Sequence, residues 1–285
     1  MVYPIACSKG SALVLCTAWL GLIALPLSLR ADAWTQEQGH GQVILTTSYF
    51  DTSEAFDASG KAQHFDFAGA FRQVLVNPYL EYGLTSRTTL VVNAFVPFLT
   101  FSNQYGAQSS AGLGDVESGI RRRLNSLESP MPISVQLTVM FPTYPADRNP
   151  PPGNHQVDVE SRFMLGRGID LGGHHAFWST GAAFRFRTGA PADQFRSDAT
   201  FGVDLTRRFM VMAQYFGITG MRNGQPFELG DNPNAQSDYD LYKGQLSLVT
   251  RVRGKSRIQI GWNDTLIGRN TGRGQTYLIS FWQDF

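Results

Sequence analysis

Hydrophobic and polar residues alternate through most of the chain beyond residue 40. Residues 133–141 show the pattern most clearly: Ile133, Leu137 and Phe141 share one face, while Gln136 and Thr138 share the other. A period of two residues is typical of a β-strand that has one apolar and one polar face. The same alternation recurs in stretches of about ten to fifteen residues that end in turn residues. Beyond residue 34 the sequence has no sustained helical periodicity and no apolar run long enough for a transmembrane helix.

These stretches predict about twelve antiparallel strands, an even number, as bacterial single-chain outer-membrane barrels have. We place them at residues 41–50, 65–84, 87–101, 112–125, 131–144, 155–169, 174–188, 194–207, 209–221, 238–253, 256–268 and 274–285. The second stretch is long enough to contain a bulge or to be two strands. The predicted fold class is all-β, an up-and-down transmembrane antiparallel β-barrel.

The lengths of the connections support this interpretation. The even-numbered connections are tight, for example at residues 85–87, 170–173, 207–208 and 254–255. Most odd-numbered ones are longer and polar, as at 51–63, 102–111, 145–154 and 222–237. Outer-membrane barrels have short periplasmic turns and longer outer loops, so both termini are expected in the periplasm. A soluble β-sandwich has no reason to sort its loops in this way.

The first 33 residues differ from the rest and predict a cleavable signal peptide. Lys9 provides a positive start, residues 12–29 are apolar, and Ala31-Asp32-Ala33 matches a cleavage site. The mature barrel is then residues 34–285; the alternative is a retained membrane anchor. Both cysteines, Cys7 and Cys16, lie in this segment, so the barrel has neither a disulfide nor a Cys-ligated metal site. Only residues 34–40 precede the first strand, too few for a plug domain, so a gate is expected from an inward-folded outer loop such as 145–154.

Charge excludes a nucleic-acid partner. The whole chain has 24 Lys and Arg against 23 Asp and Glu; without Lys9, Arg30 and Asp32 the totals are 22 and 22. A basic surplus, which nucleic-acid binding requires, is missing. The sequence contains no cofactor-binding or metal-binding pattern, and none is predicted.

Many charged residues fall on the polar faces of the predicted strands. They cannot face lipid cheaply, because an Arg or Lys at the bilayer midplane costs about 2–4 kcal/mol on the lipid side of a barrel. Two readings remain equally open: ion pairs that fill the barrel, or a polar conduit that steers a solute. Arg121, Arg123, Arg185, Arg187 and Arg251 are the expected attracting charges. The predicted pore-lining set is Glu81, Asp115, Glu117, Arg121, Arg123, Asp158, Glu160, Arg162, Arg185, Arg187, Arg196, Asp198, Lys243 and Arg251.

The last predicted strand has Tyr277, Ile279, Phe281 and Phe285 on one face and stops at an aromatic residue. This resembles the C-terminal signal that the outer-membrane assembly machinery recognises, although Gln283 stands where a hydrophobic residue is more usual. The expected partners are therefore the barrel assembly machinery, outer-membrane lipid and lipopolysaccharide, and small solutes.

Three short segments carry a family resemblance: YGLTSR at 82–87, GLGDVESGIR at 112–121 and FPT at 141–143. At these positions the sequence resembles the "MetA-pathway of phenol degradation" family of outer-membrane transporters. In that family a YGLT turn, a GLGD strand start and a PTG strand end recur in this order; here Tyr144 replaces the final glycine. The resemblance implies passage of small, often aromatic or apolar, compounds across the outer membrane, and it brings no site residues with it.

The predicted function is a monomeric outer-membrane channel that passes small solutes passively. The principal alternative is a barrel enzyme that hydrolyses lipid or peptide, with His64 and Asp66 as a rim dyad or His155 as the base. A third alternative is a structural barrel that conducts nothing. Pore behaviour separates the third from the first, and loss of hydrolysis on changing His64 or His155 to Ala identifies the second.

Overall fold

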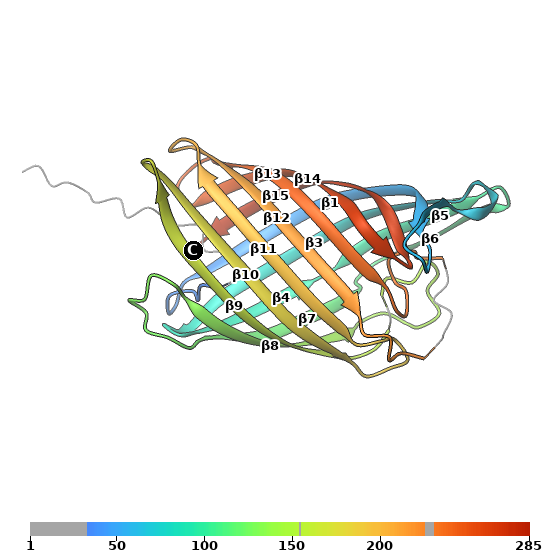
Figure 1. Ribbon diagram of the computed structural model, residues 1–285, viewed down its shortest axis with the longest axis horizontal. Helices are drawn as coiled ribbons and strands as arrows, with labels where there is room; N and C mark the ends of the chain where they lie inside the picture. The colour runs from blue at the N-terminus through green and yellow to red at the C-terminus, as the bar shows by residue number, and fades with distance from the viewer. Residues whose placement is uncertain (1–32, 154, 226–230) are drawn as a thin grey trace, which may run out of the picture.

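In the computed structural model, residues 33–153, 155–225 and 231–285 form one antiparallel β-sheet that closes into a barrel (Figure 1). The predicted signal peptide, apart from Ala33, lies outside these described residues. The elements are β1 (Gly41–Phe56), β2 (Ala62–His64), the 3-10 helix η1 (Asp66–Ala68), β3 (Ala70–Thr85), β4 (Thr88–Ala94), β5 (Val96–Asn103), β6 (Gly106–Ala111), β7 (Asp115–Arg123), β8 (Ile133–Pro142), β9 (Asp158–Leu171), β10 (His174–Arg187), β11 (Gln194–Asp204), β12 (Phe209–Gly220), β13 (Asp240–Arg251), β14 (Ser256–Arg269) and β15 (Thr271–Asp284).

The barrel closes between its first and last strands. β1 pairs with β15, with Gln42 opposite Asp284, and on its other edge β1 pairs with β3. Phe285 extends the closure, because its N–H donates to the carbonyl of Gly41 and its carbonyl accepts from the Gly41 N–H. Counting β4 with β5 and β6 with β7 as single bent strands, the described residues make a wall of twelve strands, which confirms the predicted fold class.

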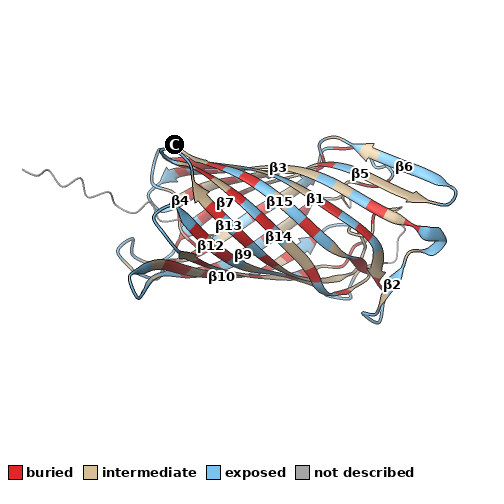
Figure 2. Ribbon diagram, turned by 90° about the horizontal axis from the view of Figure 1, so that it is seen from above, coloured by how far each residue is buried: buried red, intermediate tan, exposed pale blue. Residues whose placement is uncertain are grey.

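Burial alternates along each strand, as Figure 2 shows. In β8, Ser134 and Thr138 are buried, whereas Leu137 between them is 58% exposed. The apolar residues therefore form the outer surface that lipid covers, and the polar residues face the lumen. This is the reverse of a soluble protein, and it confirms the face assignment made for residues 133–141.

Each of the twelve predicted strands corresponds to a strand of the wall, and two of them are broken. The overlong stretch 65–84 is β3 preceded by η1, because the chain turns at Phe67 and Ala68, which have positive φ angles of 57° and 54°. The stretch 87–101 is β4 and β5, interrupted at Phe95. There the Phe95 N–H bonds to the carbonyl of Asp115, and the Phe95 carbonyl accepts from the Gly114 N–H.

The two ends of the barrel differ. At one end, which we call the tight-turn end, β3–β4, β9–β10, β11–β12 and β13–β14 are joined by short turns; the C-terminus also lies there (Figure 1). The β7–β8 connection, residues 124–132, breaks the predicted rule that every turn at this end is tight. It folds around Arg123, whose guanidinium donates to the carbonyls of Ser126 (2.7 Å) and Ser129 (3.0 Å).

The opposite end, the long-loop end, has the β5–β6 hairpin projecting beyond the wall (Figure 1). Two long connections meet over the mouth: the Asp231 N–H donates to Asn149 Oδ1 (3.0 Å), and Asn232 Nδ2 donates to the carbonyl of Pro151 (2.7 Å). The β14–β15 connection is a single residue, Asn270, with a φ of 49°. Among the described residues there is no helix long and apolar enough to cross a membrane.

Candidate solute pathway

Each of the fourteen residues predicted to line the pore is buried or half-buried in the structure. Their sequence neighbours on the other face include strongly exposed apolar side chains, such as Phe186 on β10, which lies between Arg185 and Arg187 and is 58% exposed. The structure brings most of the fourteen together in two clusters of ion pairs, and a few lie apart from both.

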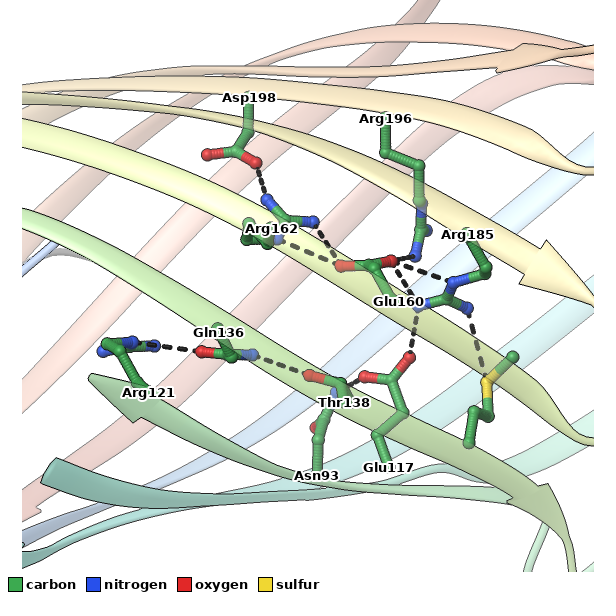
Figure 3. A network of polar contacts seen from close by, with 11 residues as sticks. Asn93, Glu117, Arg121, Gln136, Thr138, Glu160, Arg162, Arg185, Arg196 and Asp198 are labelled. Atoms are coloured by element: carbon green, nitrogen blue, oxygen red, sulfur yellow. Dashed lines mark hydrogen bonds and ion pairs between the residues drawn. The ribbon is translucent and has the colours of Figure 1, made fainter.

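The larger cluster is centred on Glu160 of β9 (Figure 3). Three guanidinium groups reach its carboxylate: Arg162 at 3.0 Å, Arg185 at 2.8 Å and Arg196 at 3.1 Å. Residues two apart on one strand and residues opposite each other on neighbouring strands share a face. That geometry brings cations from β9, β10 and β11 onto one acid.

The cluster extends to both sides of Glu160. Arg185 also pairs with Glu117 of β7 at 2.8 Å, and Glu117 accepts a hydrogen bond from Asn93 Nδ2 at 3.1 Å. On the other side Arg162 pairs closely with Asp198 of β11. The result is a bridge of alternating charges across one side of the lumen (Figure 3).

The second cluster is centred on the pair between Arg121 and Glu81, 2.7 Å apart, with side chains that are only 3% and 6% exposed. The Tyr79 hydroxyl donates to Glu81 at 2.5 Å, and Arg121 Nε donates to Gln136 Oε1 at 3.0 Å. Arg121 also donates to the backbone carbonyl of Trp34 at 3.1 Å. This contact links the wall to a segment that precedes β1.

The remaining predicted charges lie outside these two clusters. Asp158 lies 3.6 Å from Arg187, and Arg251 pairs with Asp204 at 3.0 Å. Asp115 stands near the loop residues Gly153 and Tyr144. The five Arg residues expected to attract a solute are thus engaged with carboxylates or backbone carbonyls, and their role as attracting charges stays a prediction.

Residues 34–37 run inside the barrel at its tight-turn end. The backbone N–H of Gln36 donates to Thr89 Oγ1 (2.8 Å), and the Gln36 side chain donates to Glu81 (2.7 Å). The Trp34 ring packs edge-on against Phe177 at 6.3 Å between ring centroids. The prediction placed a gate in an inward-folded outer loop; the structure adds a second narrowing that the prediction lacked, because the lumen wall supplies hydrogen-bond partners for residues 34–37.

The Trp34 ring also covers a glycine of the wall. A Cβ on Gly166 would lie 2.6 Å from the ring, so only glycine allows this close approach. Behind the ring lies an apolar cluster of Phe177, Met210, Met212, Val249 and Trp282. One sequence signal accompanies this arrangement, an aromatic residue followed by polar residues next to the predicted cleavage site, and it does not specify where these residues dock.

Cavities follow one another along the barrel axis and share walls. One of about 610 Å³ lies at the tight-turn end beside Trp34 and Phe177. The next, of about 390 Å³, also touches Phe177 and is lined by amides and hydroxyls such as Gln214, Gln245 and Ser280. It shares Phe216 with a space of about 210 Å³ inside the Glu160 cluster.

A last cavity, which we call the outer chamber, lies under the long loops and measures about 230 Å³. It shares Glu117, Arg185 and Arg196 with the space inside the Glu160 cluster. One side of it is apolar, with Leu75, Phe95, Pro97 and Leu99, and the other side is charged. Passage along the axis is therefore interrupted at two places, by the Trp34 segment and by the ion pairs.

The residues considered for catalysis are not assembled into a dyad. His64 is 77% exposed at the side chain and lies 3.6 Å from Glu54, while Asp66 begins η1. The His155 ring packs edge-on against Tyr144, and the backbone N–H of His155 donates to the Tyr144 hydroxyl at 2.9 Å. Burial raises the pKa of Tyr144, and the nearby negative charge of Asp115 raises it further. Among the described residues, His, Cys, Asp and Glu form no group that could hold a metal ion.

No protein-family model matches the sequence, and no protein of curated function matches it. The fold is similar to that of an outer membrane channel from Pseudomonas putida F1, with 15% sequence identity, 90% of this chain and 99% of that chain covered, and a TM-score of 0.65. The NanC porin matches with 8% identity over 84% of this chain and 98% of that one, with a TM-score of 0.49. A mutant of TodX, a monoaromatic hydrocarbon channel, matches with 7% identity over 88% and 91%, with a TM-score of 0.46.

The match to the Pseudomonas putida barrel covers almost the whole of both chains, so the two share a fold from the first strand to the last. It agrees with the predicted fold and with the fold that the family resemblance implies. The chain has the closed antiparallel β-barrel fold of that outer membrane channel.

Proposed function

We propose that this protein is a passive outer-membrane channel for small solutes. The observation that carries the proposal is the series of cavities that share lining residues from the tight-turn end to the outer chamber. A barrel that served only as a wall or a scaffold would gain stability from filling this space, because empty volume forfeits packing contacts. The lining of amides, hydroxyls and paired charges suits a solute that exchanges its water for protein contacts.

The proposed orientation has the long loops outside the cell and both termini in the periplasm. Longer outer loops and short periplasmic turns support it. In this orientation the Trp34 segment narrows the periplasmic end, and the outer chamber is the first space a solute meets. Residues 1–33 are the proposed signal peptide, and the outer surface contacts outer-membrane lipid and lipopolysaccharide.

The C-terminal strand is the proposed contact with the assembly machinery. Tyr277, Ile279 and Phe281 are 57%, 54% and 47% exposed on the outer face, and Phe285 stacks against Tyr82 at 6.5 Å between centroids. β15 is the C-terminal strand, and its pairing with β1 closes the barrel. The solutes we propose are small aromatic or apolar compounds, because the outer chamber has an apolar side.

Solute flux into proteoliposomes tests the proposal. The protein, expressed as the full chain and purified from outer membranes, is reconstituted and placed in isotonic solutions of small neutral solutes. We expect swelling that slows as the solute becomes larger, because the cavities are narrow. A folded, heat-modifiable barrel whose vesicles swell no faster than protein-free vesicles would contradict the proposal and would favour the structural alternative.

A further inference from the structure

Lys243 differs from the other cations that face the lumen. It lies on β13 opposite Phe216 of β12 and Thr265 of β14, and it is half-buried. No carboxylate of the described residues lies within ion-pair distance of its ammonium group; the contact that the structure gives it is the ring face of Phe50, 5.5 Å from Nζ to the ring centroid. Arg257, a buried cation outside the predicted set, pairs with Asp284 at 2.9 Å.

The ring beneath the ammonium belongs to an apolar cluster, which we call the Phe50 patch: Phe50, Phe71 and Leu99, exposed by only 5%, 0% and 2%. The rings of Phe50 and Phe71 lie 6.2 Å apart. Leu99 also lines the apolar side of the outer chamber. The patch is therefore continuous with the wall that a solute meets beneath the long loops.

This arrangement favours an anion with an apolar body. Charges paired at short range cancel each other at a distance, so the Glu160 and Glu81 clusters contribute little net field, whereas an unpaired ammonium attracts anions along the lumen. The face of Phe50 stabilises the cation only in part. A carboxylate would form a charge-assisted hydrogen bond with Nζ, and an apolar body attached to it would lie along the Phe50 patch.

We propose that Lys243 is the solute-binding cation of the pathway, and that with the Phe50 patch it selects small aromatic or apolar monocarboxylates. Uncharged compounds of the same shape pass without this contact. This inference rests on the proposed conduit and names the class of solute that the conduit prefers.

A matched set of variants isolates the charge. Lys243→Met keeps most of the side-chain length and removes the ammonium, and Lys243→Arg restores a cation. Lys255→Met makes the same change in an exposed turn at the tight-turn end. Removal of the Lys243 ammonium leaves no carboxylate without its counter-charge, so Lys243→Met should fold as well as the parent protein. Heat-modifiability on gels checks this.

Two readouts are needed, with benzoate and uncharged benzamide as probes. The first is calorimetric binding to the folded barrel in detergent. We expect benzoate to bind the parent, the Lys243→Arg and the Lys255→Met proteins, and to bind Lys243→Met at least tenfold more weakly; benzamide should bind all four equally weakly. Equal benzoate affinity in the parent and Lys243→Met proteins, or no benzoate binding to the parent, would overturn the assignment.

The second readout is the reversal potential across a bilayer in a KCl gradient. We expect Lys243→Met to move it toward cation selectivity, whereas Lys255→Met leaves it unchanged. A barrel that binds benzoate through Lys243 but passes no current would sink the proposed conduit and keep the binding site. A barrel that conducts with a reversal potential independent of Lys243 would keep the proposed conduit and overturn the assignment of Lys243 as its solute-binding cation.

Discussion

Arg185 connects the two halves of the Glu160 cluster, and Arg185→Met is the perturbation that tests whether the cluster stabilises the barrel. The Arg185 side chain is 8% exposed and pairs with Glu117 and Glu160, which are 17% and 6% exposed. Removing one partner of a buried ion pair costs about 3–5 kcal/mol, because the remaining charge stays desolvated without compensation.

The structure sets the expected value at the lower end of that range. Glu160 keeps Arg162 and Arg196, and Glu117 keeps the amide of Asn93. We therefore expect Arg185→Met to lower the free energy of unfolding by about 3 kcal/mol. Adding Glu117→Gln to this variant should recover part of the loss, since it removes the charge that Arg185→Met strands.

The assay is equilibrium unfolding in guanidinium chloride of the barrel in lipid vesicles, followed by tryptophan fluorescence, with the denaturant dependence unchanged between variants. The control is Arg72→Met, which removes an exposed pair with Asp51 (3.0 Å; 63% and 45% exposed) and should cost less than about 1 kcal/mol. If Arg185→Met lies within 0.5 kcal/mol, roughly the additivity error, of the parent protein, the reasoning is refuted: the cluster is then hydrated and its pairs contribute little.

Two further outcomes follow from the N-terminal segment and from a loop. Trp34→Ala should open the passage between the two cavities that meet at Phe177 and raise the unitary conductance, at a stability loss of no more than about 3 kcal/mol; an unchanged conductance would show that the narrowest point lies elsewhere. In the loop after β1, hydrogen bonds from Ser59, Lys61 and Gln63 lower the pKa of Asp57 to about 2. A lowered pKa means that the ionised form orders the turn above the ordinary value near 3.8 and that this order is lost as the pH falls toward about 2. The backbone amides of Ser59 and Lys61 should therefore lose protection from hydrogen exchange as the pH falls through that window. Asp57→Asn should remove this pH dependence.

The wall of the barrel was predictable because its signal is local. In residues 133–141 every second residue is apolar, and that alone fixes which side chains meet lipid. The position of each strand end was less certain: β4 and β5 break at Phe95 because of bonds to Asp115 and Gly114, which the sequence separates by about twenty residues. Likewise, the conformation of the nine-residue connection 124–132 depends on hydrogen bonds from Arg123 to two of its carbonyls, and no periodicity in the sequence predicts it.

The contents of the lumen were predictable only as a composition. The two-residue alternation along each strand predicts which charged side chains face inward. The pairing of Arg185 with both Glu117 and Glu160 depends in addition on the stagger of four strands, which a single sequence does not determine. For the same reason Lys243 could not be separated from the inward-facing Arg residues in advance, although its ammonium group lies against the Phe50 ring with no described carboxylate at ion-pair distance. The docking of the Trp34 segment was missed because its partners, Thr89 and Glu81, lie about fifty residues away in the sequence.

The central claim is that solute passes through the lumen, and a pair of introduced cysteines tests it most directly. The only cysteines of the chain are Cys7 and Cys16, so residues 34–285 have no thiol of their own. Gln214 lines the cavity of about 390 Å³, and its neighbour Ala213 is exposed on the outer face. In single-channel recordings, a charged methanethiosulfonate reagent should sharply reduce the current through Gln214→Cys and leave the current through Ala213→Cys unchanged. A folded barrel without current steps, or equal effects of the reagent on both variants, would contradict the claim.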